Sequence, residues 1–149
     1  MKRRTFLKGL AAGSALAVAA QTVLTSTASA DDDDIIHHLQ NRANPSTLEK
    51  KHVPAIEAPS KVQKDVWFDV KVKVGYLIEH PSKFNHWITK IELLVDNYDV
   101  AETEFETGGV CGPYATFRIK LSENAVLKAR AKCNLHGEWE SDPVNITVS

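Results

Sequence analysis

The chain of 149 residues is 43% hydrophobic and 25% charged, which leaves room for one domain with a core that needs no disulfide stapling. All four charged residues within residues 1–30 are basic, and the remainder holds 14 basic and 19 acidic side chains, a net charge of −5. An acidic domain is a poor candidate for nucleic-acid binding, and two cysteines without a Cys-x-x-Cys pair exclude a disulfide framework.

Residues 1–30 have the three parts of a cleavable export signal: a basic start, an apolar stretch over 9–24, and the small residues Ala28-Ser29-Ala30. The start, Arg3-Arg4-Thr5-Phe6-Leu7-Lys8, resembles the twin-arginine motif of bacterial Tat signals, although Lys2 stands where Ser is usual. A membrane anchor is the alternative, but the apolar stretch is short and rich in Ala, Gly and Ser. We expect a periplasmic protein, or one otherwise exported by the Tat pathway, with no membrane span in its mature form.

Residues 31–47 are predicted to be a flexible linker, because the like charges of Asp31–Asp34 are followed by mostly polar residues. His37 and His38 lie inside this segment. They are interpreted as solvated histidines of a tail, since nothing around them predicts a fixed ligand geometry. The folded domain is then expected over residues 48–149.

Alternation of apolar and polar residues dominates the chain from Lys61 onward and predicts an all-β domain. No window predicts an amphipathic helix of useful length. About seven short strands with regular turns between them favour a two-sheet antiparallel β-sandwich. The alternating apolar sets are Val66, Phe68, Val70, Val72 and Val74; Ile91, Leu93 and Val95; Phe117, Ile119 and Leu121; Leu127, Ala129, Ala131 and Cys133; and Val144, Ile146 and Val148.

Four histidines and one cysteine of this domain stand at strand ends or in loops, where ligands can meet at the rim of a sandwich. His52 precedes the first strong strand, His80 and His86 bracket one loop, and Cys133 and His136 share a Cys-x-x-His turn. Taken singly, each histidine is interpreted as a surface residue and Cys133 as a core thiol. Taken together, a thiolate and an imidazole at one turn can bind one metal ion.

Three segments of the chain, in this order, resemble the superoxide reductases, also called neelaredoxins and desulfoferrodoxins. They are His52-Val53-Pro54, His80-Pro81-x-x-x-x-His86-x-Ile88 and Cys133-Asn134-Leu135-His136-Gly137. The resemblance covers about residues 48–149 and implies an immunoglobulin-like sandwich with one iron ion per chain. It also implies the ligands: a plane of four imidazoles, an axial thiolate and an open position opposite the sulfur, here from His52, His80, His86, His136 and Cys133.

The resemblance implies one-electron reduction of superoxide to hydrogen peroxide, after which an external electron donor reduces the iron again. Neutral imidazoles leave a positive charge on ferrous iron that attracts the anion, and a thiolate ligand favours electron donation. In the family a lysine directly before the first histidine reaches over the open position, and Lys51 stands there in this chain. Related proteins often form dimers or tetramers, so a homo-oligomer is compatible with the resemblance.

The chain departs from the family's pattern two positions before the first histidine, where a glutamate is usual and Lys50 is found. Glu49 lies one residue further away and is a low-ranked candidate for the sixth ligand of ferric iron, with water or hydroxide as the alternative. Longer members carry a Cys-rich domain with a second iron. With Cys111 and Cys133 alone, this chain is expected to be of the one-iron type, and Cys111 is interpreted as a free thiol without a role.

Two other functions remain open from the residues alone. A cupredoxin-like electron carrier is also an exported sandwich with a Cys-x-x-His turn, but it needs two histidines and usually a nearby methionine, whereas the chain's single methionine is Met1. A non-catalytic module that stores or senses metal on the same fold is the second alternative, because a fold does not determine a function.

Overall fold

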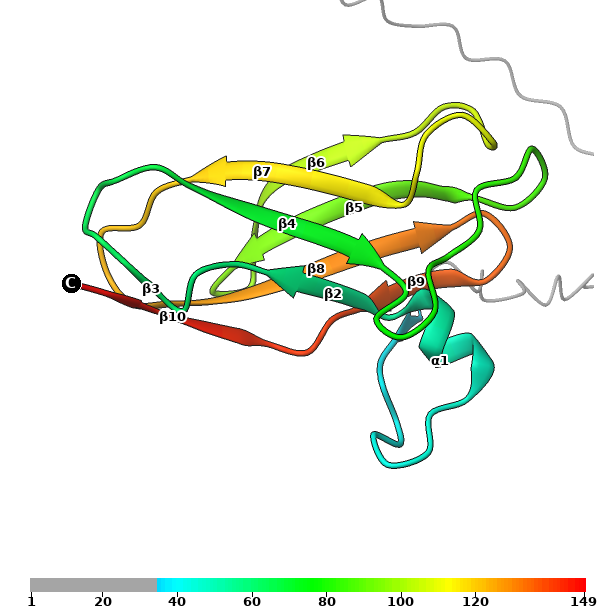
Figure 1. Cartoon of the computed structure of the whole chain (residues 1–149), viewed down its shortest axis with the longest axis horizontal. Helices are drawn as coiled ribbons and strands as arrows, with labels where there is room; N and C mark the ends of the chain where they lie inside the picture. Colours follow the sequence, from blue (N-terminus) through cyan, green and yellow to red (C-terminus); the bar gives the residue numbers. More distant parts are fainter. Residues whose placement is uncertain (1–34) are drawn as a thin grey trace, which may run out of the picture.

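The computed structural model describes residues 35–149, so the predicted signal and the first four linker residues lie outside the described part. The described residues form two layers of β-sheet with one short helix at one end (Figure 1). The elements are β1 Ile36–His37, α1 Thr47–His52, β2 Pro54–Glu57, β3 Lys61–Val62, β4 Phe68–Val74, β5 Ile88–Val95, β6 Tyr98–Glu104, β7 Tyr114–Ile119, β8 Ala125–Cys133, β9 Gly137–Glu140 and β10 Val144–Val148.

The larger sheet is built around β8, the longest strand among the described residues. One edge of β8 pairs with β5, which pairs in turn with β6. The other edge pairs with β10 near the start of β8 and with β9 near its end. β3 and β1 complete this sheet by parallel pairing with β10 and β9. The smaller sheet has the order β2-β4-β7 and is antiparallel throughout.

The core lies between the two sheets and is formed largely by the predicted alternating residues, although Val66 precedes β4 and is exposed. Val70, Val72 and Val74 of β4 are at most 1% exposed, and Leu127 and Ala129 of β8 are 0% exposed. Period-two alternation turns every second side chain of a strand to one face, so these strands bury one side against the other sheet. The prediction of an all-β sandwich is therefore confirmed, although the described residues hold ten strands, three more than expected.

The structure differs from the predicted linker over residues 31–47 once the chain reaches Ile36. The segment from Ile36 contains β1, and the backbone N–H groups of Gln40 and Asn41 donate to the carboxylate of Glu49. These backbone groups find partners on the domain, which is what orders a polar segment. The folded domain accordingly begins before the predicted boundary at Leu48.

Helix α1 is a second difference, because no helix was expected. It has six residues, too few for a helical period to be visible in the sequence. Its stability comes from a capping box, in which the Ser46 side chain accepts from the Glu49 N–H and the Glu49 carboxylate accepts from the Ser46 N–H. Within residues 35–149, no helix is long and apolar enough to span a membrane.

Candidate metal centre

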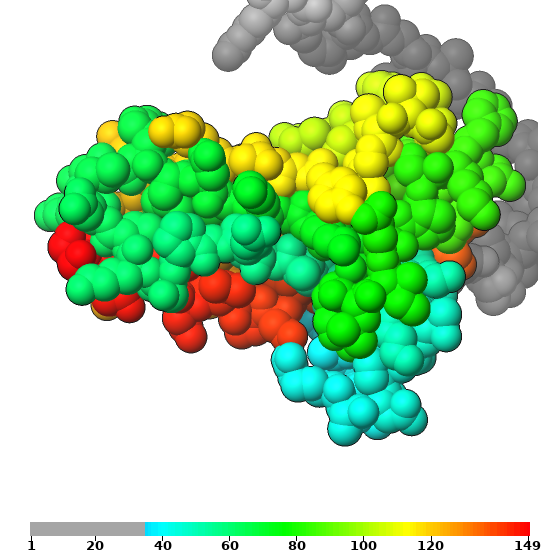
Figure 2. All heavy atoms as spheres, viewed as in Figure 1, coloured from blue at the N-terminus to red at the C-terminus, as the bar shows by residue number. Residues whose placement is uncertain are grey.

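Three segments that are far apart in the sequence meet at one end of the sandwich. They are α1, the connection between β4 and β5, and the turn between β8 and β9 (Figure 1). In the space-filling view, the cyan residues around α1 and the green residues after β4 lie together at this end (Figure 2). Each segment carries one or two of the predicted histidine and cysteine ligands.

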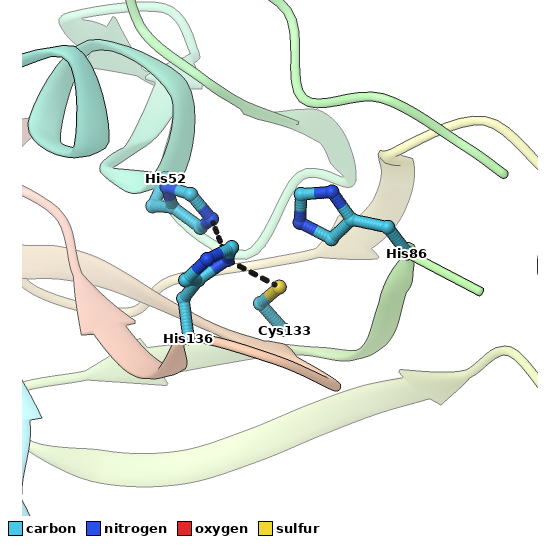
Figure 3. A group of neighbouring side chains, drawn as sticks. All are labelled: His52, His86, Cys133 and His136. Atoms are coloured by element: carbon cyan, nitrogen blue, oxygen red, sulfur yellow. Dashed lines mark hydrogen bonds between the residues drawn. The ribbon is translucent and has the colours of Figure 1, made fainter.

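His52 is the last residue of α1, and its ring is 1% exposed. Its Nδ1 lies 2.8 Å from the carbonyl oxygen of Leu48, one helical turn earlier. A carbonyl can only accept, so Nδ1 carries the hydrogen and Nε2 keeps a free lone pair. That lone pair points at His136, whose Nδ1 is 3.1 Å away (Figure 3).

His80 follows a tight turn after β4 that depends on Gly75. The φ of Gly75 is +93°, and a side chain there would overlap the carbonyl oxygen of Ile78. The His80 N–H bonds to the Val74 carbonyl oxygen at 3.0 Å, which brings the ring back over the end of the sheet. Its Nδ1 lies 2.7 Å from the Pro81 carbonyl oxygen, and its buried Nε2 has no hydrogen-bond partner.

His86 and Cys133 are held together by the side chain of Asn134. The Asn134 Oδ1 accepts from the Trp87 N–H at 2.9 Å, and its Nδ2 donates to the Asn85 carbonyl oxygen at 3.1 Å. The side chain of Asn134, which follows Cys133, is thus bonded to the residues on both sides of His86. The Nε2 of His86 is buried and, like that of His80, has no partner.

Cys133 ends β8 and points inward, as the alternation of that strand predicts, with 2% of its surface exposed. Its Sγ lies 3.5 Å from Nδ1 of His136 (Figure 3). The ligand atoms of His52, His86, Cys133 and His136 all lie within 4.8 Å of one another. Atoms that bind one ion at right angles, each about 2.0–2.3 Å from it, are about 3 Å apart, so these spacings suit a shared metal ion.

The four imidazoles form a closed cycle, and this cycle includes His80. Neighbouring ring centroids are 4.7 Å apart for His52–His80 and His80–His86, 4.9 Å for His86–His136, and 4.7 Å for His136–His52. All four pairs are edge to face, and the diagonal pair His52–His86 is 6.1 Å apart. The structure therefore places all four predicted histidine rings side by side, whereas the group of ligand atoms that lie within 4.8 Å of one another contains His52, His86, Cys133 and His136 but not His80.

Burial suits the protonation states that a metal requires. Desolvation, opposed by the Leu48 carbonyl, lowers the pKa of His52 to about 4, and desolvation with the charge of His52 lowers the pKa of His80 to about 4. Both rings are therefore neutral near pH 7. Burial raises the pKa of Cys133, so a metal ion has to displace the thiol proton when it binds.

Glu49 does not join this cluster, contrary to its candidacy as the sixth ligand. Its Oε1 accepts from Gln40 at 2.6 Å and its Oε2 from Ser46 at 2.6 Å. These backbone hydrogen bonds, that of Ser46 first, lower the pKa of Glu49 to about 2. The carboxylate is ionised and occupied at the start of α1, while His52 lies at the other end of the helix.

The charge around the cluster is positive on the side of His86. After desolvation, the charges of His136, Lys83 and Lys51 lower the pKa of His86. Lys51 is half-buried and directly precedes His52 on α1. The predicted position of a lysine beside the cluster therefore agrees with the electrostatics of the site.

Sequence reasoning missed two residues that support the cluster, Asn134 and Trp139. Trp139 stacks on His52 with 5.3 Å between ring centroids, and its Nε1 donates to the His136 carbonyl oxygen at 2.8 Å. A buried tryptophan in β9 looks like an ordinary core residue in the sequence. The only available signal was its place three residues after His136.

Known proteins are similar to this chain in sequence and in fold. The family model for desulfoferrodoxin matches residues 44–142. The neelaredoxin of Megalodesulfovibrio gigas is 37% identical over 109 residues, covering 62% of this chain and 84% of that protein. The superoxide reductase of Pyrococcus furiosus is 36% identical over 110 residues, covering 62% of this chain and 86% of that protein. The solved structure of the superoxide reductase (neelaredoxin) from Ignicoccus hospitalis has a TM-score of 0.65 and 36% identity, over 76% of this chain and 95% of that one.

The chain belongs to the desulfoferrodoxin family. The match spans α1, the smaller sheet, most of the larger sheet and every segment that carries a predicted ligand, so the predicted family is confirmed. In this desulfoferrodoxin chain, α1, the β4–β5 connection and the β8–β9 turn are what gather the four histidines and Cys133.

Proposed function

We propose that this desulfoferrodoxin-family chain is a superoxide reductase that holds one iron ion with His52, His80, His86, His136 and Cys133. The observation that carries the proposal is the closed cycle of four imidazoles beside the Cys133 thiol. Within this cycle the Nε2 atoms of His80 and His86 are buried without partners. Buried polar atoms without partners are costly in a folded protein, and a bound metal ion would satisfy them.

The donor set fits iron better than zinc or blue copper. Structural zinc sites are usually tetrahedral with four ligands, and blue copper sites take two histidines, one cysteine and a weak axial ligand such as methionine. Five donors, four imidazoles and one thiolate, exceed both requirements and suit a metal with a higher coordination number. No methionine lies in the described part of the chain, which removes the usual axial ligand of the cupredoxin alternative.

Iron, when bound, would supply the single electron that converts superoxide, with two protons, to hydrogen peroxide. The chain's own residues would prepare the site for that anion. Neutral His52 and His80 add no negative charge, and Lys51 and Lys83 add positive charge near His86. This positive field attracts the superoxide anion. An external one-electron donor would restore the starting state.

We place this function outside the cytoplasm, because the basic start, apolar stretch and Ala28-Ser29-Ala30 of residues 1–30 support export. The twin-arginine pattern supports export by the pathway that carries proteins already folded. Iron would then be acquired in the cytoplasm, where metal supply rather than affinity selects the ion, since most nitrogen and sulfur sites bind copper and zinc more tightly than ferrous iron.

The test is a visible absorption spectrum of the purified protein before and after mild oxidation, with iron content measured on the same sample. We expect about one iron per chain and a band that appears on oxidation and is lost in Cys133→Ser. Superoxide decay by pulse radiolysis should yield one peroxide per superoxide consumed. Dismutation, which yields one peroxide per two superoxides, or an iron-loaded protein that leaves superoxide untouched, would contradict the proposed activity.

A further inference from the structure

Three aromatic rings form a continuous stack that runs from β1 to the proposed metal site. His37 of β1 stacks on Trp139 of β9, with 4.8 Å between centroids and 30° between planes. Trp139 stacks in turn on His52, at 5.3 Å and 28°. His37 is exposed, Trp139 is 6% exposed and His52 is 1% exposed. The outer ring therefore covers Trp139, and Trp139 covers the imidazole.

Trp139 contacts two of the proposed ligands in different ways. It stacks on the ring of His52, and its Nε1–H donates to the backbone carbonyl of His136 at 2.8 Å. The two ligands lie 84 residues apart, and their facing nitrogen atoms are 3.1 Å apart. The position of one indole therefore affects both sides of this short ligand pair.

The segment before α1 fixes the outer face of that indole. β1 pairs in parallel with β9, with Ile36 opposite Glu138 and His37 opposite Trp139. A few residues later the Gln40 N–H bonds to Glu49 of α1 at 2.6 Å. Residues 36–49 therefore connect β9, which carries Trp139, to α1, which carries His52.

We propose that His37 is a positioning residue that clamps Trp139 against His52 and thereby helps to retain the metal. The proposal rests on the metal site described under the proposed function. Removing a partner that orients a metal ligand typically costs 10–100-fold in metal affinity. His37 acts through one further ring, so we expect an effect of about tenfold, at the lower end of that range.

The experiment uses Co²⁺ as the probe on the full chain, with the free ion set by a competing chelator and the ligand-field absorption bands recorded. His37→Ala should raise the Kd for Co²⁺ about tenfold and broaden or shift those bands. His37→Phe keeps a ring over Trp139 and should restore Kd and spectrum to near the wild-type values. His38→Ala, a neighbouring change at a residue that lies 4.0 Å from Glu140, should change neither.

The outcomes separate this clamp from the site itself. If the wild-type chain does not bind Co²⁺, or binds it without a thiolate absorption band, the proposed metal centre is overturned. A wild type that binds Co²⁺ while His37→Ala binds equally well with an unchanged spectrum would overturn the clamp alone. Equal weakening in His37→Ala and His37→Phe would also overturn it, because the stacked ring would then be irrelevant. A melting curve of each metal-free variant shows that the comparison is between folded proteins.

Discussion

At the scale of single residues, the free nitrogen of His52 and of His80 is determined by what the other ring nitrogen binds. His52 and His80 each commit Nδ1 to a backbone carbonyl, at 2.8 Å and 2.7 Å, and present Nε2. His136 presents Nδ1 instead, toward both Cys133 and His52. A metal ligand oriented in this way loses little freedom on binding, because its tautomer and ring orientation are already set.

The role proposed for Lys51 also depends on a single residue, through the positive charge of its side chain. We expect Lys51→Ala to slow the bimolecular reaction with superoxide roughly tenfold, since a positive charge beside the site accelerates the arrival of an anion. The rate of the variant should also depend less on ionic strength. Pulse radiolysis at two salt concentrations measures both effects. Lys50→Ala is the control, and an equal loss there would assign the effect to net charge instead.

At the scale of elements, short segments hold the ligands because each has a specific local support. α1 is only six residues long, and its capping box satisfies the donors at its start. The turn before His80 relies on the left-handed backbone of Gly75. The turn after β8 is tied to the loop of His86 through Asn134. Loops of this kind can hold a site rigidly because their polar groups are bonded.

The capping carboxylate of α1 gives the fold a pH dependence. The pKa of Glu49 is lowered to about 2 in the folded chain, so its stabilising effect is present above the ordinary value of 4.5 and is lost as pH falls from 4.5 toward 2. Glu49→Gln should therefore lower the urea midpoint at pH 6 and shrink the loss between pH 5 and pH 3. Unfolding of both metal-free proteins across this range tests it. The buried histidines contribute equally to the pH dependence of both proteins. If the urea midpoints of the wild type and Glu49→Gln fall in parallel as pH falls, Glu49 does not have this role.

The turn of Gly75 gives a second prediction for an element. A methyl group there would overlap the Ile78 carbonyl oxygen and lie 2.8 Å from the His80 backbone nitrogen. Gly75→Ala should destabilise the fold by about 1–3 kcal/mol and weaken metal binding, because the turn that carries His80 must shift. Thermal unfolding and Co²⁺ titration measure the two effects. Gly112→Ala, where a methyl would meet the ring of Tyr114 at 3.0 Å, is the matched control and should bind Co²⁺ normally.

At the scale of the whole molecule, the site exists only when both sheets are assembled. α1 leads into β2 of the smaller sheet, whereas Cys133 and His136 belong to the larger sheet. The core between the sheets, with Val70, Leu93 and Leu127 at 0% exposure, sets the distance between these ligands. An unfolded chain would lack this arrangement, so metal binding is linked to folding.

This linkage predicts the effect of metal removal. At a free metal concentration of 100 times Kd, binding to the folded state alone stabilises it by about 2.7 kcal/mol. For a domain of this size, chelation should then lower the melting temperature by roughly 10 °C. Calorimetry with and without a chelator measures the change. Cys133→Ser should show a smaller difference, and an unchanged melting temperature in the wild type would mean that the folded chain holds no tightly bound ion.

The sequence by itself determined the sandwich, and its resemblance to a known family supplied the proposed members of the cluster. Period-two alternation is a local property, so it identified β4 and β8 and the inward face of Cys133. The Cys-x-x-His turn and the histidines at strand ends were also visible locally. The closed cycle of rings was not, because no pattern within one segment gives the distance between segments.

Only the tertiary structure decided how the cluster is supported. Six residues are too few to show a helical period, so α1 was absent from the prediction. Glu49 was a weak candidate for the sixth ligand in the sequence, and in the structure the N–H groups of Gln40 and Ser46 bind its carboxylate. His37 looked like part of a flexible tail, yet it stacks on Trp139. The physical reason is the same in the last two cases: hydrogen bonds and ring contacts depend on distances in space, and partners far apart in the chain leave no periodic trace in its sequence.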